Sequence, residues 1–480
     1  MHAGRTILVS VCGIVLAATV AACTNLGDVL DVPPPAGVAT LEGLQSRSAA
    51  EGVFNGAKGE IFSMVASYPG VISLGGLLSD EFVTGVSLDG SENQNIDARI
   101  THKFGNYFEQ GNAILTGLLD TRSRLLLSAI GLRQFEPDTE LRKVGEAFAL
   151  VGYIEIFLAE DYCAGVPLSR VLPGSGIEYG HPLTTDSLLA VAEAHFDSAL
   201  ANAHGDANVT ALASLGLARA RLNRGHFSAA ASAAAAVPTG FVYQAEMPPD
   251  GNPNGPNLYT YGTSVWASCS NFNVGDREGA NGLDFISAND PRLVLDTTVS
   301  MTCERYAFVN YGSTTEGAPW YYPVKFGNPS QFVPFATGVE ARLIEAEAAL
   351  QQSNVAAWAA ALNTLRDSAA STYLQIAAMP HLTSDSTTAA STTLQQDVLF
   401  RERAFWLYGT GTRLGDLRRL IRQYGRTAAT VFPTGVYHQG VFSEIPDYGA
   451  DVSLTLPTVE SGTRITNPYY QGCLTSAATP

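Results

Sequence analysis

The chain has 480 residues, of which 46% are hydrophobic and 15% charged, a composition typical of a globular protein and not of an intrinsically disordered one. With 28 basic and 45 acidic side chains its formal net charge is −17, which excludes nucleic-acid binding through a generally basic surface. The length allows two or three ordinary domains, or one large irregular domain.

The N-terminus has the pattern of a lipoprotein signal peptide over residues 1–22. Arg5 precedes an apolar run without acidic residues, and this run ends in small residues directly before Cys23. We therefore expect cleavage before Cys23 and acylation of its thiol and new amino group, followed by a proline-containing stalk over 23–38. The alternatives are an ordinary secretory signal, or a membrane-spanning anchor for which the run is short.

The region from about 40 to 240 repeats apolar residues mostly at helical spacing. An apolar and aromatic run predicts one helix over 148–159, and Thr185 opens the next. The segment 211–238 has the small residues and the Gly225 turn that are typical of a tetratricopeptide helix pair. Such pairs stack on one another and share a continuous core.

Further helices are predicted at 340–351, 356–367 and 394–408. Before them, the segment of about 241–335 is rich in Gly, Pro and Asn, which favour loops and short strands. Residues 426–480 have many turn signals, and we expect irregular coil that wraps back on the helices.

The sequence therefore predicts one mostly α domain over 39–480. Its expected parts are tetratricopeptide-like helical repeats at about 40–240 and 336–425, a loop-rich insertion at about 241–335, and the irregular C-terminal segment at 426–480.

Four cysteines remain once the signal peptide is removed and Cys23 carries lipid. In an oxidising compartment they predict one or two disulfides, for which three connectivities exist. Cys269 with Cys303 is the first expectation, because both lie in the loop-rich insertion; Cys163 and Cys473 are the other candidates. Zinc binding has less support, because the chain has no CxxC pair.

No specific catalytic motif is present: the chain has neither an HExxH nor a GxSxG pattern. The glycine-rich stretch 409–415 follows a helix and not a strand, which is the wrong context for a nucleotide cradle. We therefore expect no enzyme activity, no metal and no cofactor, although carboxylate pairs that hydrolyse sugars cannot be recognised from spacing.

A dense cluster of charged residues begins within the 394–408 helix and continues after it. Its arginines could clamp an anionic ligand, or the cluster could form a buried ion-pair network that joins the last helices, and we favour the network. The cluster comprises Arg401, Glu402, Arg403, Arg413, Asp416 and Arg418, with Glu345 and Glu347 as expected partners.

The insertion is also rich in aromatic residues, with 11 among the 71 residues from Gly255 to Lys325. Tyr and Trp stack on the apolar C–H faces of sugar rings, so the cluster indicates a glycan site on loops. The alternative is that these side chains pack the insertion onto the helices.

Together these motifs make the chain resemble the SusD/RagB group of outer-membrane nutrient-binding lipoproteins over nearly its whole length. The block from Arg401 to Arg419 is the most specific part of the resemblance. The other matching parts are the lipobox at Cys23, the acidic turn at 76–82, the helix over 147–168 that ends in a Val-Pro-Leu turn, the pair at 341–348 and 362–366, and the closing pattern at 456–468.

The resemblance implies a SusD-like α–α superhelix and a non-enzymatic lipoprotein that faces the cell exterior. It also implies a partner, a SusC-like TonB-dependent barrel that receives the captured oligosaccharide or peptide. Ligand contacts in the group come from the loops that correspond here to 89–103 and 306–322. The expected contacts are Asn93, Asn95, Arg99, Tyr311, Trp320 and Tyr321.

Two other functions stay open from the sequence: a lipid-anchored glycoside hydrolase, and a helical repeat protein that binds peptides or docks another protein.

Overall fold

The structure, a computed structural model, describes residues 44, 46–67, 69–84, 92–103, 109–137, 140–172, 176–245, 272–296, 321–326, 333–437, 445–457 and 467–474. The expected signal peptide, Cys23 and the stalk lie outside these residues. So do Tyr311, Trp320, Cys269 and Cys303.

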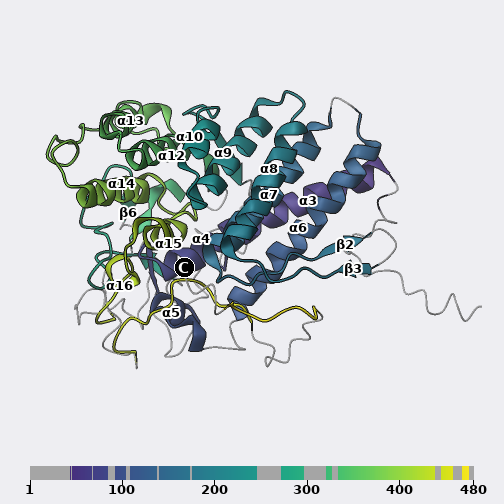
Figure 1. Ribbon diagram of the computed structural model, residues 1–480, viewed down its shortest axis with the longest axis horizontal. Coiled ribbons are helices and arrows are strands. Elements are labelled where there is room, and N and C mark those ends of the chain that lie inside the picture. Colours follow the sequence, from purple (N-terminus) through teal and green to yellow (C-terminus); the bar gives the residue numbers. More distant parts are fainter. Residues whose placement is uncertain are drawn as a thin grey trace, which may run out of the picture.

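The described chain is mostly helical, as predicted, and its largest part is a row of antiparallel helices (Figure 1). Each helix of the row packs on the next, and α10 packs on α12 although the insertion separates them in sequence. The two predicted helical regions therefore form one continuous scaffold. Its helices are α3 (Arg47–Ala66), α6 (Glu109–Phe135), α7 (Arg142–Asp161), α8 (Thr185–Ala201), α9 (Ala207–Asn223), α10 (Phe227–Ala234), α12 (Gly338–Gln351) and α13 (Val355–Asp367).

Capping side chains determine where several of these helices begin. Thr184 Oγ1 accepts the Ser187 N–H at the start of α8 (3.1 Å), and Asp206 Oδ1 accepts the Val209 N–H at the start of α9 (2.9 Å). Each cap satisfies a backbone N–H that the first turn leaves without a helical partner. Helix α9 therefore begins before the expected position near Ala211, because the cap and not the apolar pattern sets its start.

Two glycines allow α7 and α9 to approach the aromatic ring between them. Phe196 of α8 is fully buried, and a Cβ placed at Gly152 or Gly216 would lie 2.6 or 2.1 Å from its ring. These distances are far below van der Waals contact, so larger residues would push the helices apart. The small-residue pattern at Gly216 that predicted a tetratricopeptide pair thus reflects close helix packing.

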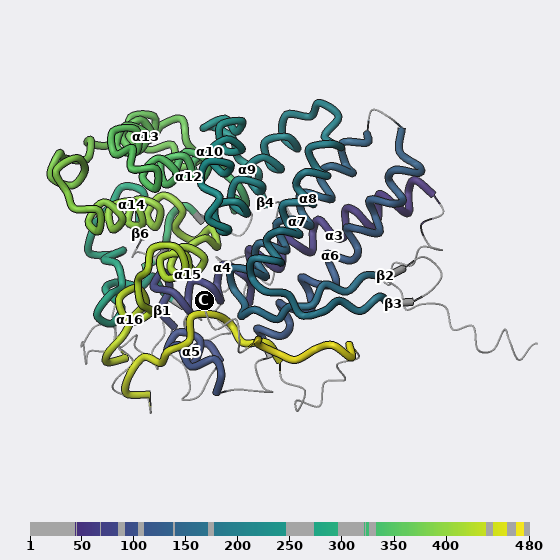
Figure 2. Tube along the Cα trace, in the orientation of Figure 1, coloured from purple at the N-terminus to yellow at the C-terminus, as the bar shows by residue number. Residues whose placement is uncertain are grey.

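A second layer covers one side of this scaffold (Figure 2). Among the described residues, four antiparallel two-stranded ladders accompany it: β1 with β5, β2 with β3, β4 with β8, and β6 with β7. The elements outside the scaffold are α4 (Val71–Leu78), β1 (Phe82–Thr84), α5 (Glu92–Asp97), β2 (Arg170–Leu172), β3 (Gly176–Glu178), β4 (Val242–Ala245), β5 (Phe272–Val274), β6 (Leu295–Asp296), β7 (Tyr322–Pro323), η5 (Val324–Phe326), β8 (Val333–Thr337), η6 (Ala369–Ser371), α14 (Thr392–Trp406), α15 (Arg413–Tyr424) and α16 (Ala428–Val431).

Strands β4 and β8 form the neck of the insertion. They pair side by side, so the chain leaves the scaffold after α10 and returns at α12 through one narrow connection. Thr337, the last residue of β8, is also the N-cap of α12. The insertion therefore replaces the connection between two neighbouring scaffold helices without disturbing their packing.

The segment Arg47–Leu78 is long and apolar enough to span a membrane by length and composition alone. Within it, 82% of the most apolar window is buried inside the protein. In the described residues, α3 and α4 are therefore buried in the core of the protein.

The C-terminal part of the described chain returns to the end of α7. Leu454 N–H donates to the Asp161 carbonyl (2.7 Å), and the Cys163 N–H donates to the Leu454 carbonyl (3.0 Å). A disulfide joins Cys163 to Cys473, 310 residues apart in sequence. Two of the four candidate cysteines are thus paired, and a Cys269–Cys303 bridge stays a prediction.

We expect Cys473→Ser to lower the free energy of unfolding by about 2–4 kcal/mol, because the bridge restricts a very long loop in the unfolded chain. Denaturant titrations of both proteins, with and without reductant, measure the change. Reductant should lower the stability of the native protein by more than it lowers that of the variant, which has already lost this bridge. Equal stability of the two oxidised proteins would contradict this role of the bridge.

Candidate functional site

A buried ion-pair network lies where α14 and α15 meet. Arg403 forms a two-pronged pair with Asp416, with Nε–Oδ2 and Nη2–Oδ1 distances of 2.7 and 2.9 Å. Arg419 bridges Asp416 (3.0 Å) and Glu347 of α12 (2.8 Å). All four residues are at most 2% exposed, so each charge depends on its partners for stability.

Helix α15 also connects the scaffold to the early acidic turn. Arg413 pairs with Asp80 through Nε–Oδ1 (2.6 Å) and Nη2–Oδ2 (2.8 Å) contacts. Arg418 Nη1 donates to the carbonyls of Ala159 and Tyr162 at the end of α7, each at 3.0 Å. The arginines are thus occupied by protein groups in the described structure, which favours the network over an anion clamp.

The remaining members of the predicted cluster face a different neighbour. Glu402 accepts from Arg292 (2.9 Å) and Arg366, and Arg401 pairs with Asp284. The prediction that Glu345 joins the network is wrong: it pairs with Arg342 at 3.2 Å, and both side chains are about one quarter exposed. Helical spacing turns Glu345 toward the surface, whereas Glu347 points into the core.

Asp416→Asn should lower the free energy of unfolding by about 3–5 kcal/mol at neutral pH, because it removes the buried carboxylate that Arg403 and Arg419 share and leaves Glu347 as their nearest charged partner. Asp397→Asn, at an exposed pair with Arg426, is the matched control and should cost less than about 1 kcal/mol. Denaturant titration measures both, and equal effects would contradict the assigned role.

The same carboxylate should contribute to acid sensitivity. Burial would raise the pKa of Asp416, but the charges of Arg403 and Arg419 outweigh it and hold the pKa below the ordinary value of 3.8. Its stabilisation is thus present above pH 3.8 and is lost as pH falls through the folded-state pKa. The free energy of unfolding that is lost on acidification should be smaller for Asp416→Asn than for the native protein.

Glu81 is buried and Lys325 is partly buried where the insertion meets the scaffold. Gly409 N–H donates to Glu81 Oε1 (3.0 Å), and Lys325 Nζ donates to the Tyr408 carbonyl. Burial raises the pKa of Glu81 to about 8 and lowers the pKa of Lys325 to about 7. Lys325 also lines a cavity of about 460 Å³ beside the neck of the insertion.

The raised pKa of Glu81 has a defined effect on stability. Its neutral form is favoured in the folded protein, so its contribution is present below pH 4.5 and is lost as pH rises through about 8. Glu81→Gln keeps an acceptor for the Gly409 N–H but cannot ionise. We therefore measure the free energy of unfolding of the variant minus that of the native protein by denaturant titration. This difference should be more favourable to the variant at pH 9 than at pH 5. A pH-independent difference would contradict burial as the cause.

Three of the predicted ligand contacts lie in or next to α5. Asn93, Asn95 and Arg99 are 8%, 7% and 1% exposed, so they do not project from an open loop as expected. Arg99 Nη1 donates to the Pro433 carbonyl (2.6 Å), and its guanidinium lies over the Phe432 ring at 4.6 Å. Arg99 therefore fastens the α5 region to the C-terminal segment in this structure.

The structure brings Tyr321 close to the base of the same region. Strand β1 pairs with β5, which contacts β7, and Asn273 Oδ1 accepts the Tyr321 N–H at 3.0 Å. The acidic turn that leads to α5 and the end of the insertion therefore lie side by side. We use the name loop face for two segments that both neighbour the β1–β5 ladder, residues 92–103 through α5 and residues 321–326 through β7. Trp320, next to Tyr321, lies outside the described residues.

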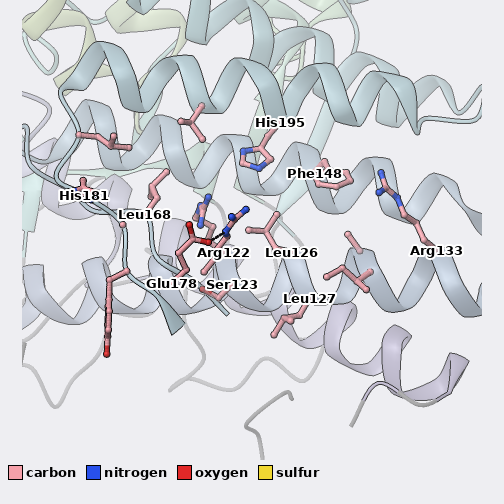
Figure 3. A pocket seen from close by; sticks show the side chains of 17 residues that line it. Arg122, Ser123, Leu126, Leu127, Arg133, Phe148, Leu168, Glu178, His181 and His195 are labelled. Carbon is pink, nitrogen blue, oxygen red and sulfur yellow. Dashed lines mark hydrogen bonds and ion pairs between the residues drawn. The ribbon is translucent and has the colours of Figure 1, made fainter. Parts of the chain in front are cut away.

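A separate cleft of about 700 Å³ opens on the scaffold (Figure 3). Helices α6 and α8 form its walls, Phe148 of α7 lies in its floor, and the segment around β2 and β3 closes one end. Sequence reasoning missed this cleft. The one available signal was a charged residue, Glu155, inside the apolar run that predicted α7.

Glu155 holds two of the residues that line the cleft. Its side chain is fully buried, Oε1 accepts from Arg122 Nε (2.7 Å), and Oε2 lies 2.8 Å from His195 Nδ1. His195 stacks on Phe148 with ring centroids 6.1 Å apart. Both polar side chains are therefore fixed in place by packing and by a buried carboxylate.

A scan of protein-family models finds no match to the chain, and a search of curated proteins finds none. Solved structures do match. A SusD-like protein from Bacteroides fragilis NCTC 9343 aligns with a TM-score of 0.59 and 13% identity over 92% of this chain and 100% of that chain.

Two further matches are known as carbohydrate-binding or glycan-binding proteins. A SusD-like carbohydrate-binding protein from the same organism has a TM-score of 0.53 and 16% identity, covering 78% of this chain and 86% of that one. Surface glycan-binding protein A from Bacteroides uniformis has a TM-score of 0.51 and 14% identity, covering 80% and 90%. At such low identity these likenesses establish the fold alone. The protein therefore has the SusD-like fold.

Proposed function

We propose that the protein is a non-enzymatic lipoprotein of the outer membrane that captures a glycan at the cell exterior. It is anchored through Cys23 and passes its ligand to a SusC-like TonB-dependent transporter. The observation that carries the proposal is a SusD-like fold in which the acidic-turn region and the end of the aromatic-rich insertion meet at one loop face.

The chemistry of this face supports a sugar ligand. Tyr321 and Trp320 supply ring surfaces for the apolar faces of sugars, and Asn93 and Asn95 offer amides that suit hydroxyl groups. Because the two asparagines are largely buried here, we propose that they contribute through a small local rearrangement on binding.

The anchor and compartment are supported by the lipobox-like sequence before Cys23 and by the Cys163–Cys473 disulfide. Disulfides persist in oxidising environments such as the periplasm and cell surface. Both observations fit an exported, lipid-anchored protein.

Electrophoresis of the chain from Thr24 onward, in gels that contain one polysaccharide each, tests glycan capture. We expect retardation by at least one glycan without the release of new reducing ends. New reducing ends would instead support a glycoside hydrolase, and no retardation by any glycan would favour a peptide ligand.

Trp320→Ala should weaken glycan binding by about fivefold or more, because it removes a ring stack, and a ring stacked on an aromatic side chain contributes roughly 1–3 kcal/mol in the case of nucleic-acid bases. Trp358→Phe, at a fully buried scaffold position, is a control for a tryptophan substitution away from the face. The control should retain glycan binding if it folds, which circular dichroism checks. Unchanged retardation of Trp320→Ala would place the ligand elsewhere.

A further inference from the structure

We propose that the scaffold cleft is a second ligand site that binds an acidic oligosaccharide, with a uronic-acid carboxylate held by its arginines. This site is distinct from the loop face and does not require it. Figure 3 shows a trough with His181 toward one end and Arg133 toward the other, and with Arg122 and Glu178 between them. A volume of about 700 Å³ lies within the range of small-ligand sites.

The charge of the cleft differs from that of the whole protein. Arg122, Arg133 and Arg170 line it, against Glu178 in the lining and Glu155 beneath. With the histidines neutral these five groups leave a formal charge of +1, whereas the chain carries −17. Arg122 is paired with Glu155 and Arg170 with Glu178, so the excess positive charge lies on Arg133. A concave site with a net positive charge in an acidic protein favours an anionic ligand and disfavours a cationic one.

The polar side chains are prepared for recognition by the buried Glu155. It fixes one edge of Arg122, whose Nη1 also donates to the Ser169 carbonyl at 3.3 Å. Arginine binds carboxylates through parallel N–H donors, and a side chain already held in place loses little entropy on binding. Because Nδ1 of His195 faces Glu155, its other ring nitrogen, Nε2, is the one that a ligand hydroxyl would meet.

The apolar lining suits the rings of a sugar and not a bare inorganic anion. Phe148 and His195 stack with planes 16° apart, and Arg133 lies over the Phe148 ring at 5.2 Å. Leu126 and Ile130 of α6 continue this surface, and Ile130 is 47% exposed. A ligand with both a carboxylate and an apolar ring face uses all of these features.

Isothermal titration of the mature chain with a trimer of galacturonic acid and with its methyl ester tests the proposal. The ester keeps the rings but removes the charges. We expect the acid to bind at least tenfold more tightly than the ester, and to weaken when salt is raised from about 0.05 to 0.5 M. Equal affinity for acid and ester, or no binding of the acid, would overturn the proposal.

Variants locate the site. Ile130→Trp should fill the cleft and reduce the affinity for the acid trimer at least tenfold. Leu394→Trp places the same side chain at a similarly exposed position on α14 and should change it less than twofold. Arg133→Gln combined with Arg170→Gln should weaken binding of the acid trimer but not binding of its methyl ester. Equal effects of the two tryptophan variants would overturn the location.

Trp320→Ala separates this site from the proposed function. If the cleft is independent, this variant loses retardation by the glycan captured at the loop face but binds the acid trimer with unchanged affinity. If the variant lost both gel retardation and binding of the acid trimer, the two ligands would share one site, and the proposal of a second site in the cleft would be overturned.

Discussion

The buried arginines of α15 hold together parts of the chain that are far apart in sequence. Arg413 pairs with Asp80, which is 333 residues away. Arg418 donates to a backbone carbonyl at the end of α7, and Arg419 pairs with Glu347 of α12. A buried charge is costly unless its partner and hydrogen bonds are all in place. Because several such pairs must form at once, this network favours one arrangement of scaffold and acidic turn over the alternatives.

That constraint extends to the surface that we propose binds the glycan. Asp80 immediately precedes Glu81, whose carboxyl accepts from Gly409, and β1 then pairs with β5 at the base of the insertion. In the proposed function, the scaffold supplies the base and the connections that leave it supply the ligand contacts. This division is typical of binding proteins whose functional residues lie on loops. The cleft beside α8 is different, since its polar groups come mainly from the scaffold helices.

Much of the fold could be predicted from local patterns, because helices and their caps depend on residues close in sequence. The partners of buried charges could not be predicted. Nothing in the sequence near Arg413 indicates that it pairs with Asp80. Glu345 and Glu347 differ only in the side of α12 on which they lie, and the sequence did not show which side faces the core. Likewise, local sequence patterns could not show that Arg99 is buried against Phe432, because the two residues are far apart in the chain. The scaffold cleft was missed because it needs three helices and a strand pair to form, although Glu155 within an apolar run was a usable signal.

Hydrogen–deuterium exchange of the mature protein, with and without the glycan that retards it in gels, tests the central claim most directly. The account predicts that ligand slows exchange in residues 92–103 and 321–326, while α9, α12 and α13 are unchanged. Slowed exchange confined to the scaffold helices, with no change at the loop face, would contradict it.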